Sequence, residues 1–230
     1  MVRREFFKVK KEDCIYNTVC KNECSDSCIR YIQFNRLLEL SNLPKLYKKP
    51  IKLYSIEKDY NAYKELDNIG KDIVNFIKNG YNLYICSTTP GNAKTTWSAK
   101  LMLKYFDKVW PNSYDITRGL FIHVPTFLLD LKKFNERPEY IDRIKDADLV
   151  IWDDLAFSKL TDYEHEQLLQ YIDYRLQNEL SNIYTSNIID YENLKNYIGG
   201  RLTSRIFNNS KVIKFVSDDF RTGGKLWQPQ

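Results

Sequence analysis

Residues 88–95 of this chain read TTPGNAKT, between a short apolar run and a segment of helical periodicity. The stretch matches part of the phosphate-binding loop G-x-x-x-x-G-K-[ST], in which the lysine reaches the β- and γ-phosphates and the hydroxyl holds Mg²⁺. Lys94 and Thr95 occupy these two positions at the start of a predicted helix, whose free N–H groups attract anions. Thr88 and Ala93 replace the two glycines, and a left-handed backbone at Ala93 would cost about 1 to 2 kcal/mol. The stretch predicts a strand, a phosphate-binding turn and a helix, with an ordinary strand-to-helix turn as the alternative.

A second motif supports a nucleotide site. Residues 149–154 read LVIWDD, an apolar strand that ends in two acids, as the Walker B motif does. Asp153 is expected to hold Mg²⁺ directly or through water, and Asp154 to orient or deprotonate the attacking water. Two solvated aspartates at the end of a strand are the alternative, but two motifs in the right order seldom arise by chance. The residues predicted to bind ATP or ADP are Pro90, Gly91, Asn92, Ala93, Lys94, Thr95, Thr96 and Asp153, of which Thr95 and Asp153 hold magnesium.

Short apolar runs recur along the chain and alternate with helical segments. The runs occupy residues 81–86, 119–124, 148–152, 182–185 and 211–216. The largest helical segment is residues 162–180, and an amphipathic helix over residues 59–77 is expected to end at Gly80. This alternation predicts an α/β fold, with a parallel five-stranded sheet that is covered by helices on both faces.

Four cysteines, Cys14, Cys20, Cys24 and Cys28, lie close together near the N-terminus. Such a density indicates either a disulfide knot or a metal site. The N-terminus has no apolar signal-peptide core, and no apolar run reaches the roughly 18 to 20 residues that span a bilayer. We therefore expect a cytoplasmic protein without membrane contact, in which thiols stay reduced. Because four thiolates would repel one another without a cation, the cysteines are predicted to bind zinc.

A chain of 230 residues indicates one large core and a small appendage. The helix predicted after the cysteines carries its apolar face on Tyr31, Phe34, Leu37 and Leu38. Residues 42–50 contain two prolines and read as a linker. The sequence therefore predicts a zinc-binding module of residues 1–45 and a core of residues 46–230. The apolar face of the module's helix is either free for a partner or packed against the core of the same chain, and the linker favours the first.

Asn187 and two arginines are further candidates for the nucleotide site. The fourth predicted strand runs into the residues TSN at 185–187, where the side chain of Asn187 is placed to reach the γ-phosphate or the lytic water. Arg201 and Arg205 lie four residues apart on one predicted helical face. Surface arginines are ordinarily just solvated. The functional interpretation is that these two stabilise the transition-state charge at the phosphates of a neighbouring subunit.

The cysteine cluster and four short segments, GNAKTTW, VIWDDLA, TSN and RLTSRI, resemble the DnaC/DnaI-like replicative helicase loaders of bacteria and their phages, a branch of the AAA+ ATPases. The resemblance covers most of the chain. It implies a P-loop AAA+ core that lacks the usual C-terminal helical lid and has weak ATPase activity. It also implies a sensor role for Asn187, an arginine-finger role for Arg205 assisted by Arg201, and a second sensor at Arg221.

Two departures from the family pattern lead us to expect slow hydrolysis. Ala93 stands where the family usually has glycine, and Asp154 replaces the commoner glutamate with a shorter side chain. Nucleotide-dependent self-association through the AAA+ interface is then expected to matter more than turnover.

The resemblance also predicts the partners of this chain. Residues 131–134 read LKKF and correspond to a helix that faces single-stranded DNA in loaders of this class. Lys132, Lys133 and Phe134 are the predicted contacts, through backbone charge and base stacking. The alternative is a core Phe134 beside solvated lysines, and the net charge of +5 does not decide between them.

The function expected from these features is ATP-dependent loading of a replicative helicase in the cytoplasm of a bacterial host. The chain would bind the hexameric helicase through residues 1–45 and assemble on single-stranded DNA through its core. Two alternatives remain, a transposition helper AAA+ ATPase, which usually lacks the cysteine cluster, and a zinc-dependent adaptor that binds no nucleotide. His123, His165 and Cys86 are expected to be structural.

Overall fold

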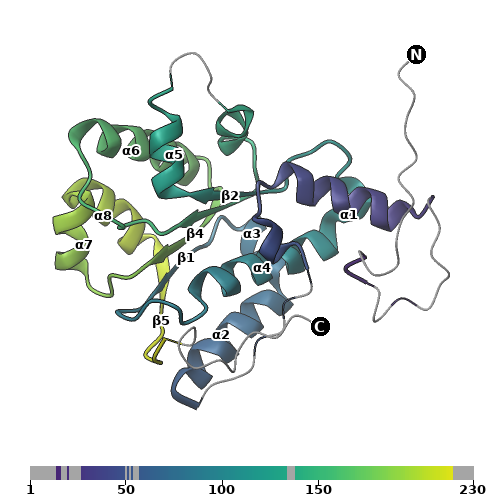
Figure 1. Cartoon of the computed structure of the whole chain (residues 1–230), viewed down its shortest axis with the longest axis horizontal. Helices are drawn as coiled ribbons and strands as arrows, with labels where there is room; N and C mark the ends of the chain where they lie inside the picture. The colour runs from purple at the N-terminus through teal and green to yellow at the C-terminus, as the bar shows by residue number, and fades with distance from the viewer. Residues whose placement is uncertain are drawn as a thin grey trace.

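A parallel five-stranded sheet forms the centre of the molecule (Figure 1). The computed structural model describes residues 14–16, 20, 27–49, 51, 53, 57–133 and 138–219. The strands are β1 (Asn82–Cys86), β2 (Gly119–His123), β3 (Leu149–Asp153), β4 (Ser181–Ser186) and β5 (Ser210–Lys214). Their order is β2-β3-β4-β1-β5, and every neighbouring pair is parallel. The predicted five-stranded parallel sheet is confirmed, with each strand within two residues of its predicted bounds.

The helices cover both faces of the sheet, as predicted. They are α1 (Ile29–Leu40), α2 (Tyr60–Lys71), α3 (Ile73–Lys78), α4 (Lys94–Val109), α5 (Val124–Asp130), α6 (Asp162–Gln177), α7 (Tyr191–Ile198) and α8 (Gly200–Asn208). In Figure 1 the helices α1 to α4 lie on one side of the sheet and α5 to α8 on the other. Because side chains alternate along a strand, Ile151 and Ile183 join the first apolar core, whereas Trp152 and Tyr184 join the second.

The segment before the first strand forms two helices where one was predicted. The chain breaks between α2 and α3 at Asp72, whose backbone N–H donates to the carbonyl oxygens of Asn68 and Ile69. Gly80 follows α3 with φ 64°, and its N–H donates to the carbonyl oxygen of Ile77 over 3.0 Å. Gly80 therefore ends this helical segment as predicted, because glycine adopts the left-handed conformation without steric cost.

Helix α1 packs against the core, so the expectation of an apolar face free for a partner is wrong. Phe34, Leu37 and Leu38 are buried in the same cluster as the strands and α4. The ring of Phe34 meets the ring of Phe106 edge to face, with centroids 6.3 Å apart. The residues after α1 also hold to the sheet, since the N–H of Phe121 donates to the Ser41 carbonyl oxygen over 2.7 Å. The proline-containing segment thus joins α1 to the core instead of holding it away.

The zinc prediction finds no support in the described part of the chain. Cys14, Cys20 and Cys28 are not joined in a disulfide within the described part of the chain, and Cys24 lies outside the described residues. Among the described residues, no three His, Cys, Asp or Glu side chains come together as a group that could hold a metal ion. Zinc binding therefore stays a prediction, and so does the division of the chain at residue 45. Within the described ranges, the helices are too short or too polar to cross a membrane.

Candidate nucleotide site

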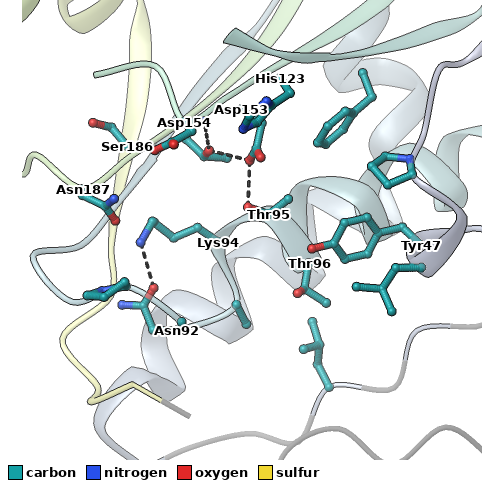
Figure 2. A pocket seen from close by; sticks show the side chains of 18 of the residues that line it. Tyr47, Asn92, Lys94, Thr95, Thr96, His123, Asp153, Asp154, Ser186 and Asn187 are labelled. Atoms are coloured by element: carbon teal, nitrogen blue, oxygen red, sulfur yellow. Dashed lines mark hydrogen bonds between the residues drawn. The ribbon is translucent and has the colours of Figure 1, made fainter. Parts of the chain in front are cut away.

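A pocket of about 580 Å³ opens at the carboxyl ends of the strands, beside the start of α4 (Figure 2). In a parallel sheet this edge collects the loops that follow each strand, and ligands commonly bind there. The lining includes nearly every residue predicted for the nucleotide: Pro90, Gly91, Asn92, Ala93, Lys94, Thr95, Thr96, Asp153, Asp154 and Asn187. Segments that are about a hundred residues apart in the sequence thus meet at one cavity.

The turn between β1 and α4 has the geometry of a phosphate-binding loop. Ala93 adopts φ 68° and ψ 15°, and α4 begins at the next residue. The left-handed backbone considered for Ala93 from its sequence position is therefore present. Ser87 fixes the start of the loop, since its hydroxyl donates to the Thr89 carbonyl oxygen over 2.9 Å and accepts from the Asn92 side-chain amide.

Lys94 is held inside this loop by neighbouring oxygen atoms. Its Nζ donates to Asn92 Oδ1 over 3.1 Å and to the Thr89 carbonyl oxygen over 3.2 Å. Only 8% of the residue is exposed, and it sits at the first turn of α4, where N–H groups point away from the helix. The ammonium group and the helix N-terminus together make this loop suited to bind phosphate oxygens.

Thr95 and Asp153 meet directly, as the two motifs required. Thr95 Oγ1 donates to Asp153 Oδ1 over 2.7 Å, and Thr185 Oγ1 donates to the same oxygen over 2.7 Å (Figure 2). Burial raises the pKa of the Asp153 carboxyl, while the hydrogen bonds from Thr185 and Thr95 act in the opposite direction. A hydroxyl beside a carboxylate is a set of hard oxygen donors, which fits Mg²⁺.

Asp154 and Asn187 occupy the same side of the pocket as Lys94 (Figure 2). Asp154 follows β3 with φ 59°, and its backbone N–H donates to Thr185 Oγ1 over 3.0 Å. Asn187 directly follows β4 and is exposed. The acid and the amide predicted to act on the lytic water are therefore placed at neighbouring strand ends, β3 and β4.

One wall of the pocket was missed by the sequence reasoning. Apolar and aromatic side chains form it: Pro44, Leu46, Tyr47, Leu53, Tyr63 and Phe121. Three of these six side chains come from residues 42–50, which the sequence analysis interpreted as a linker, and the aromatic Tyr47 was the one signal of a binding surface there. His123 also lines the pocket, at the end of β2 and opposite Asp153 in the strand register. The expectation that His123 is structural stays a prediction.

The two arginines of the RLTSRI segment are on α8, outside the lining of this pocket. Arg205 Nε lies 2.8 Å from Asp173 Oδ1 of α6, and Arg201 Nη2 lies 4.0 Å from Asp173 Oδ2. Roughly half or more of each arginine side chain remains exposed, at 49% and 65%. Arg221, the predicted second sensor, lies outside the described residues.

Two of the residues predicted to contact DNA, Lys132 and Lys133, lie after a helix and not on one. Helix α5 ends at Asp130, and the backbone N–H groups of Lys132 and Lys133 then donate to carbonyl oxygens only three residues back, those of Leu129 and Asp130. Lys132 pairs with Glu164 at 2.9 Å and Lys133 with the Asp130 carboxylate at 2.8 Å. Phe134 lies outside the described residues.

Comparison with known proteins shows similarity in structure alone. No protein-family model matches the sequence, and no curated protein matches it. The crystal structure of the DnaC helicase loader aligns with a TM-score of 0.59 at 18% identity, over 78% of this chain and 98% of that one. The crystal structure of DnaI aligns with a TM-score of 0.62 at 18% identity, over 80% and 98%. AMPPCP-bound DnaA from Aquifex aeolicus aligns with a TM-score of 0.55 at 19% identity, over 76% of this chain and 51% of that one. This chain therefore has the fold that these replication proteins share.

Proposed function

We propose that this chain binds ATP with Mg²⁺ and hydrolyses it slowly. One observation carries the proposal: Lys94, Thr95, Asp153, Asp154 and Asn187 line a single pocket at the N-terminus of α4. Each of these side chains has the chemical group needed for binding phosphate, holding Mg²⁺ or acting on water. The hydrogen bond from Thr95 to Asp153 joins the two sequence motifs. The structure of DnaA with AMPPCP, a protein of the same fold, is consistent with a nucleotide at such a site.

Each residue has a distinct part in this proposal. Lys94 and the N–H groups of the first turn of α4 bind the phosphates. Thr95 and Asp153 would hold the magnesium ion, which offsets phosphate charge when it is bound. Asp154 orients the attacking water and takes its proton, and Asn187 contacts that water or the γ-phosphate. The apolar wall around Tyr47 shields the nucleoside, since aromatic and aliphatic side chains favour the faces of a base.

Two substitutions separate binding from hydrolysis. Lys94→Ala should abolish Mg²⁺-dependent binding of a labelled ATP analogue, whereas Asp154→Ala should keep binding and lose turnover, because Asp154 acts mainly on the water. Lys108→Ala removes an exposed lysine from the last turn of the same helix and should change neither. Unchanged nucleotide affinity in Lys94→Ala would rule out the phosphate loop.

We further propose that nucleotide binding serves the loading of a hexameric replicative helicase onto single-stranded DNA. The support is the fold shared with DnaC and DnaI along nearly their whole length, together with the resemblance in the cysteine cluster and the RLTSRI segment. In this proposal residues 1–45 bind the helicase with zinc on Cys14, Cys20, Cys24 and Cys28. The exposed guanidinium groups of Arg205 and Arg201 reach the nucleotide of a neighbouring copy. Lys132, Lys133 and Phe134 contact DNA.

A capture experiment with the intact chain tests the loading proposal. The parent protein should retain the host's hexameric helicase, and Cys20→Ser with Cys24→Ser should lose both zinc and helicase while ATP binding continues. Elemental analysis gives the zinc content of the same samples. If the double variant captures the helicase as the parent does, residues 1–45 are not the binding module.

A further inference from the structure

Thr185 connects the two acids of the nucleotide site to the neighbouring strand. It is the penultimate residue of β4, where it pairs with Ile85 of β1 in the strand register, and only 2% of it is exposed. We propose that Thr185 is a positioning residue, which holds the Asp153 carboxylate and the Asp154 backbone in the arrangement that binds Mg²⁺ and activates water. This inference rests on the proposed nucleotide function of the pocket.

The hydroxyl group of Thr185 is hydrogen-bonded to both acids, as a donor to one and an acceptor from the other. Oγ1 donates its hydrogen to Asp153 Oδ1 over 2.7 Å and accepts the backbone N–H of Asp154 over 3.0 Å. The carbonyl oxygen of Thr185 accepts the backbone N–H of Leu155 over 2.9 Å. Three consecutive residues of one segment are thus tied to a single residue of the next strand. A hydroxyl can be donor and acceptor at once, which an aliphatic side chain cannot be.

The backbone of Asp154 explains why such a tie is needed. At φ 59° it adopts a left-handed conformation that residues other than glycine seldom adopt. Strained conformations of this kind persist where surrounding contacts fix them, and they are common at functional sites. The bond from the Asp154 N–H to Thr185 fixes this turn. Without it we expect the chain after β3 to relax toward an extended backbone, which would turn the Asp154 carboxylate away from the pocket.

The Asp153 carboxylate is oriented by two hydroxyls that come from different elements. Thr95 reaches Oδ1 from the first turn of α4, and Thr185 reaches the same oxygen from β4. Asp153 is itself buried, at 7% exposed, so a lost hydrogen bond there is not replaced easily by water. Groups that orient a metal ligand typically change metal affinity or activity by about 10- to 100-fold when they are removed.

The test compares Thr185→Val with Thr185→Ser in the full chain. Valine has the shape of threonine without the hydroxyl, and serine keeps the hydroxyl without the methyl. We expect Thr185→Val to need about 10-fold more Mg²⁺ than the parent for half-maximal binding of a labelled ATP analogue, and to hydrolyse at least about 10-fold more slowly. Thr185→Ser should stay within about threefold of the parent on both measures.

The outcomes separate this inference from the function on which it rests. If the parent shows no Mg²⁺-dependent nucleotide binding, the proposed function fails. If the parent binds as proposed and Thr185→Val has the parent's Mg²⁺ requirement and turnover, Thr185 is not a positioning residue and the pocket assignment stands. Urea denaturation reports folding, and Thr185→Ala provides a second variant without the hydroxyl. If neither hydroxyl-free variant folds while serine does, the hydroxyl is structural and the inference is overturned.

Discussion

At Ala93 the backbone adopts the left-handed conformation that a glycine would take in most phosphate loops, with φ 68°. In this conformation the Cβ of any residue except glycine comes too close to the following carbonyl oxygen, which costs about 1 to 2 kcal/mol. The neighbouring residues of the loop hold this conformation in place. Asn92 is completely buried and bonded to Ser87, and Lys94 already belongs to α4. The strain at Ala93 is therefore maintained by residues on both of its sides.

Replacing Ala93 with glycine should stabilise the protein by about 1 kcal/mol, because relief of the strain exceeds the added freedom of the unfolded chain. The same change at Ala99, a buried position in the middle of α4, should destabilise it by about 1 kcal/mol or more. Urea denaturation of the two variants measures both effects. A loss of stability in Ala93→Gly would show that the alanine methyl contributes packing that outweighs its strain.

At the scale of an element, helix α6 is joined to the sheet by one buried arginine. Arg175 has no exposed surface, and its Nε donates to Asn182 Oδ1 over 2.7 Å. Its Nη atoms donate to the carbonyl oxygens of Ile144, Ala147, Asp148 and Ser181. Burial lowers the pKa of Arg175 to about 9. These hydrogen bonds join the end of α6 and the loop before β3 to the start of β4. They therefore fix the starts of β3 and β4, the two strands whose other ends carry the acids and Asn187 of the pocket.

Arg175→Lys should lower the free energy of unfolding by about 3 to 5 kcal/mol. Lysine keeps the charge but carries its donors on one nitrogen, so it cannot reach acceptors that surround a planar guanidinium group. Arg36→Lys, on the partly exposed face of α1, is the matched control and should change stability by less than about 1 kcal/mol. Equal urea midpoints for the two variants would contradict the role assigned to Arg175.

At the scale of the whole molecule, α1 belongs to the same folding unit as the sheet. Its buried residues share an apolar cluster with α4 and with strands β1 to β5. Removing that face from water is worth roughly 1.5 to 3 kcal/mol for each large side chain. A core lacking α1 would expose the matching surface on α4 and β2.

Leu37→Ala should therefore destabilise the entire protein by about 2 to 5 kcal/mol, in a single unfolding transition. Ile32 lies on the same helix with 45% of its surface exposed, and Ile32→Ala should cost less than about 1 kcal/mol. Urea denaturation followed by tryptophan fluorescence measures both, because the three described tryptophans, Trp97, Trp110 and Trp152, lie in or beside the cores. A separate early transition in Leu37→Ala would indicate an independent N-terminal module.

The tyrosines predict a loss of stability at alkaline pH. Burial is the largest cause that raises the pKa of six of them in the folded state: Tyr16, Tyr63, Tyr84, Tyr105, Tyr140 and Tyr184. An unfolded tyrosine loses its proton near pH 10, so the unfolded state gains stability as the pH rises above that value. Each tyrosine that stays protonated in the folded state then lowers the free energy of unfolding by about 1.4 kcal/mol per pH unit. The pKa of Arg175 is lowered in the folded state, so above about pH 9 this residue raises the free energy of unfolding. It is a single group, and it opposes the effect of six tyrosines.

The urea midpoint should stay nearly constant from about pH 7 to 9 and fall steeply above about pH 10. Tyr184→Phe should make this fall shallower, because the Tyr184 hydroxyl is buried and has no hydrogen-bond partner among the described residues. Tyr81→Phe is the control, since Tyr81 is 57% exposed. A midpoint that is the same at about pH 8 and pH 11 would contradict the prediction.

The sequence by itself determined the strands, the phosphate loop and the acidic pair. These features depend on residues that are close in the chain. A strand of the central sheet is a short apolar run, and Lys94 and Thr95 are the first residues of the helix that follows the phosphate loop. Their chemistry follows from position along a few residues, so residues 88–95 and 149–154 could be interpreted before any fold was known.

Only the tertiary structure decided what completes the site and what α1 does. An apolar helix face suits a partner protein as well as its own core, and spacing along the chain cannot distinguish the two. The same holds for Thr185 and for Tyr47, whose neighbours in the pocket are distant in sequence. Arg175 likewise looks like an ordinary solvated residue of a helix until its acceptors before β3 and at the start of β4 are known. Long-range contacts set these roles, because burial and hydrogen bonding depend on which segments meet, and the sequence pattern of one segment does not contain that information.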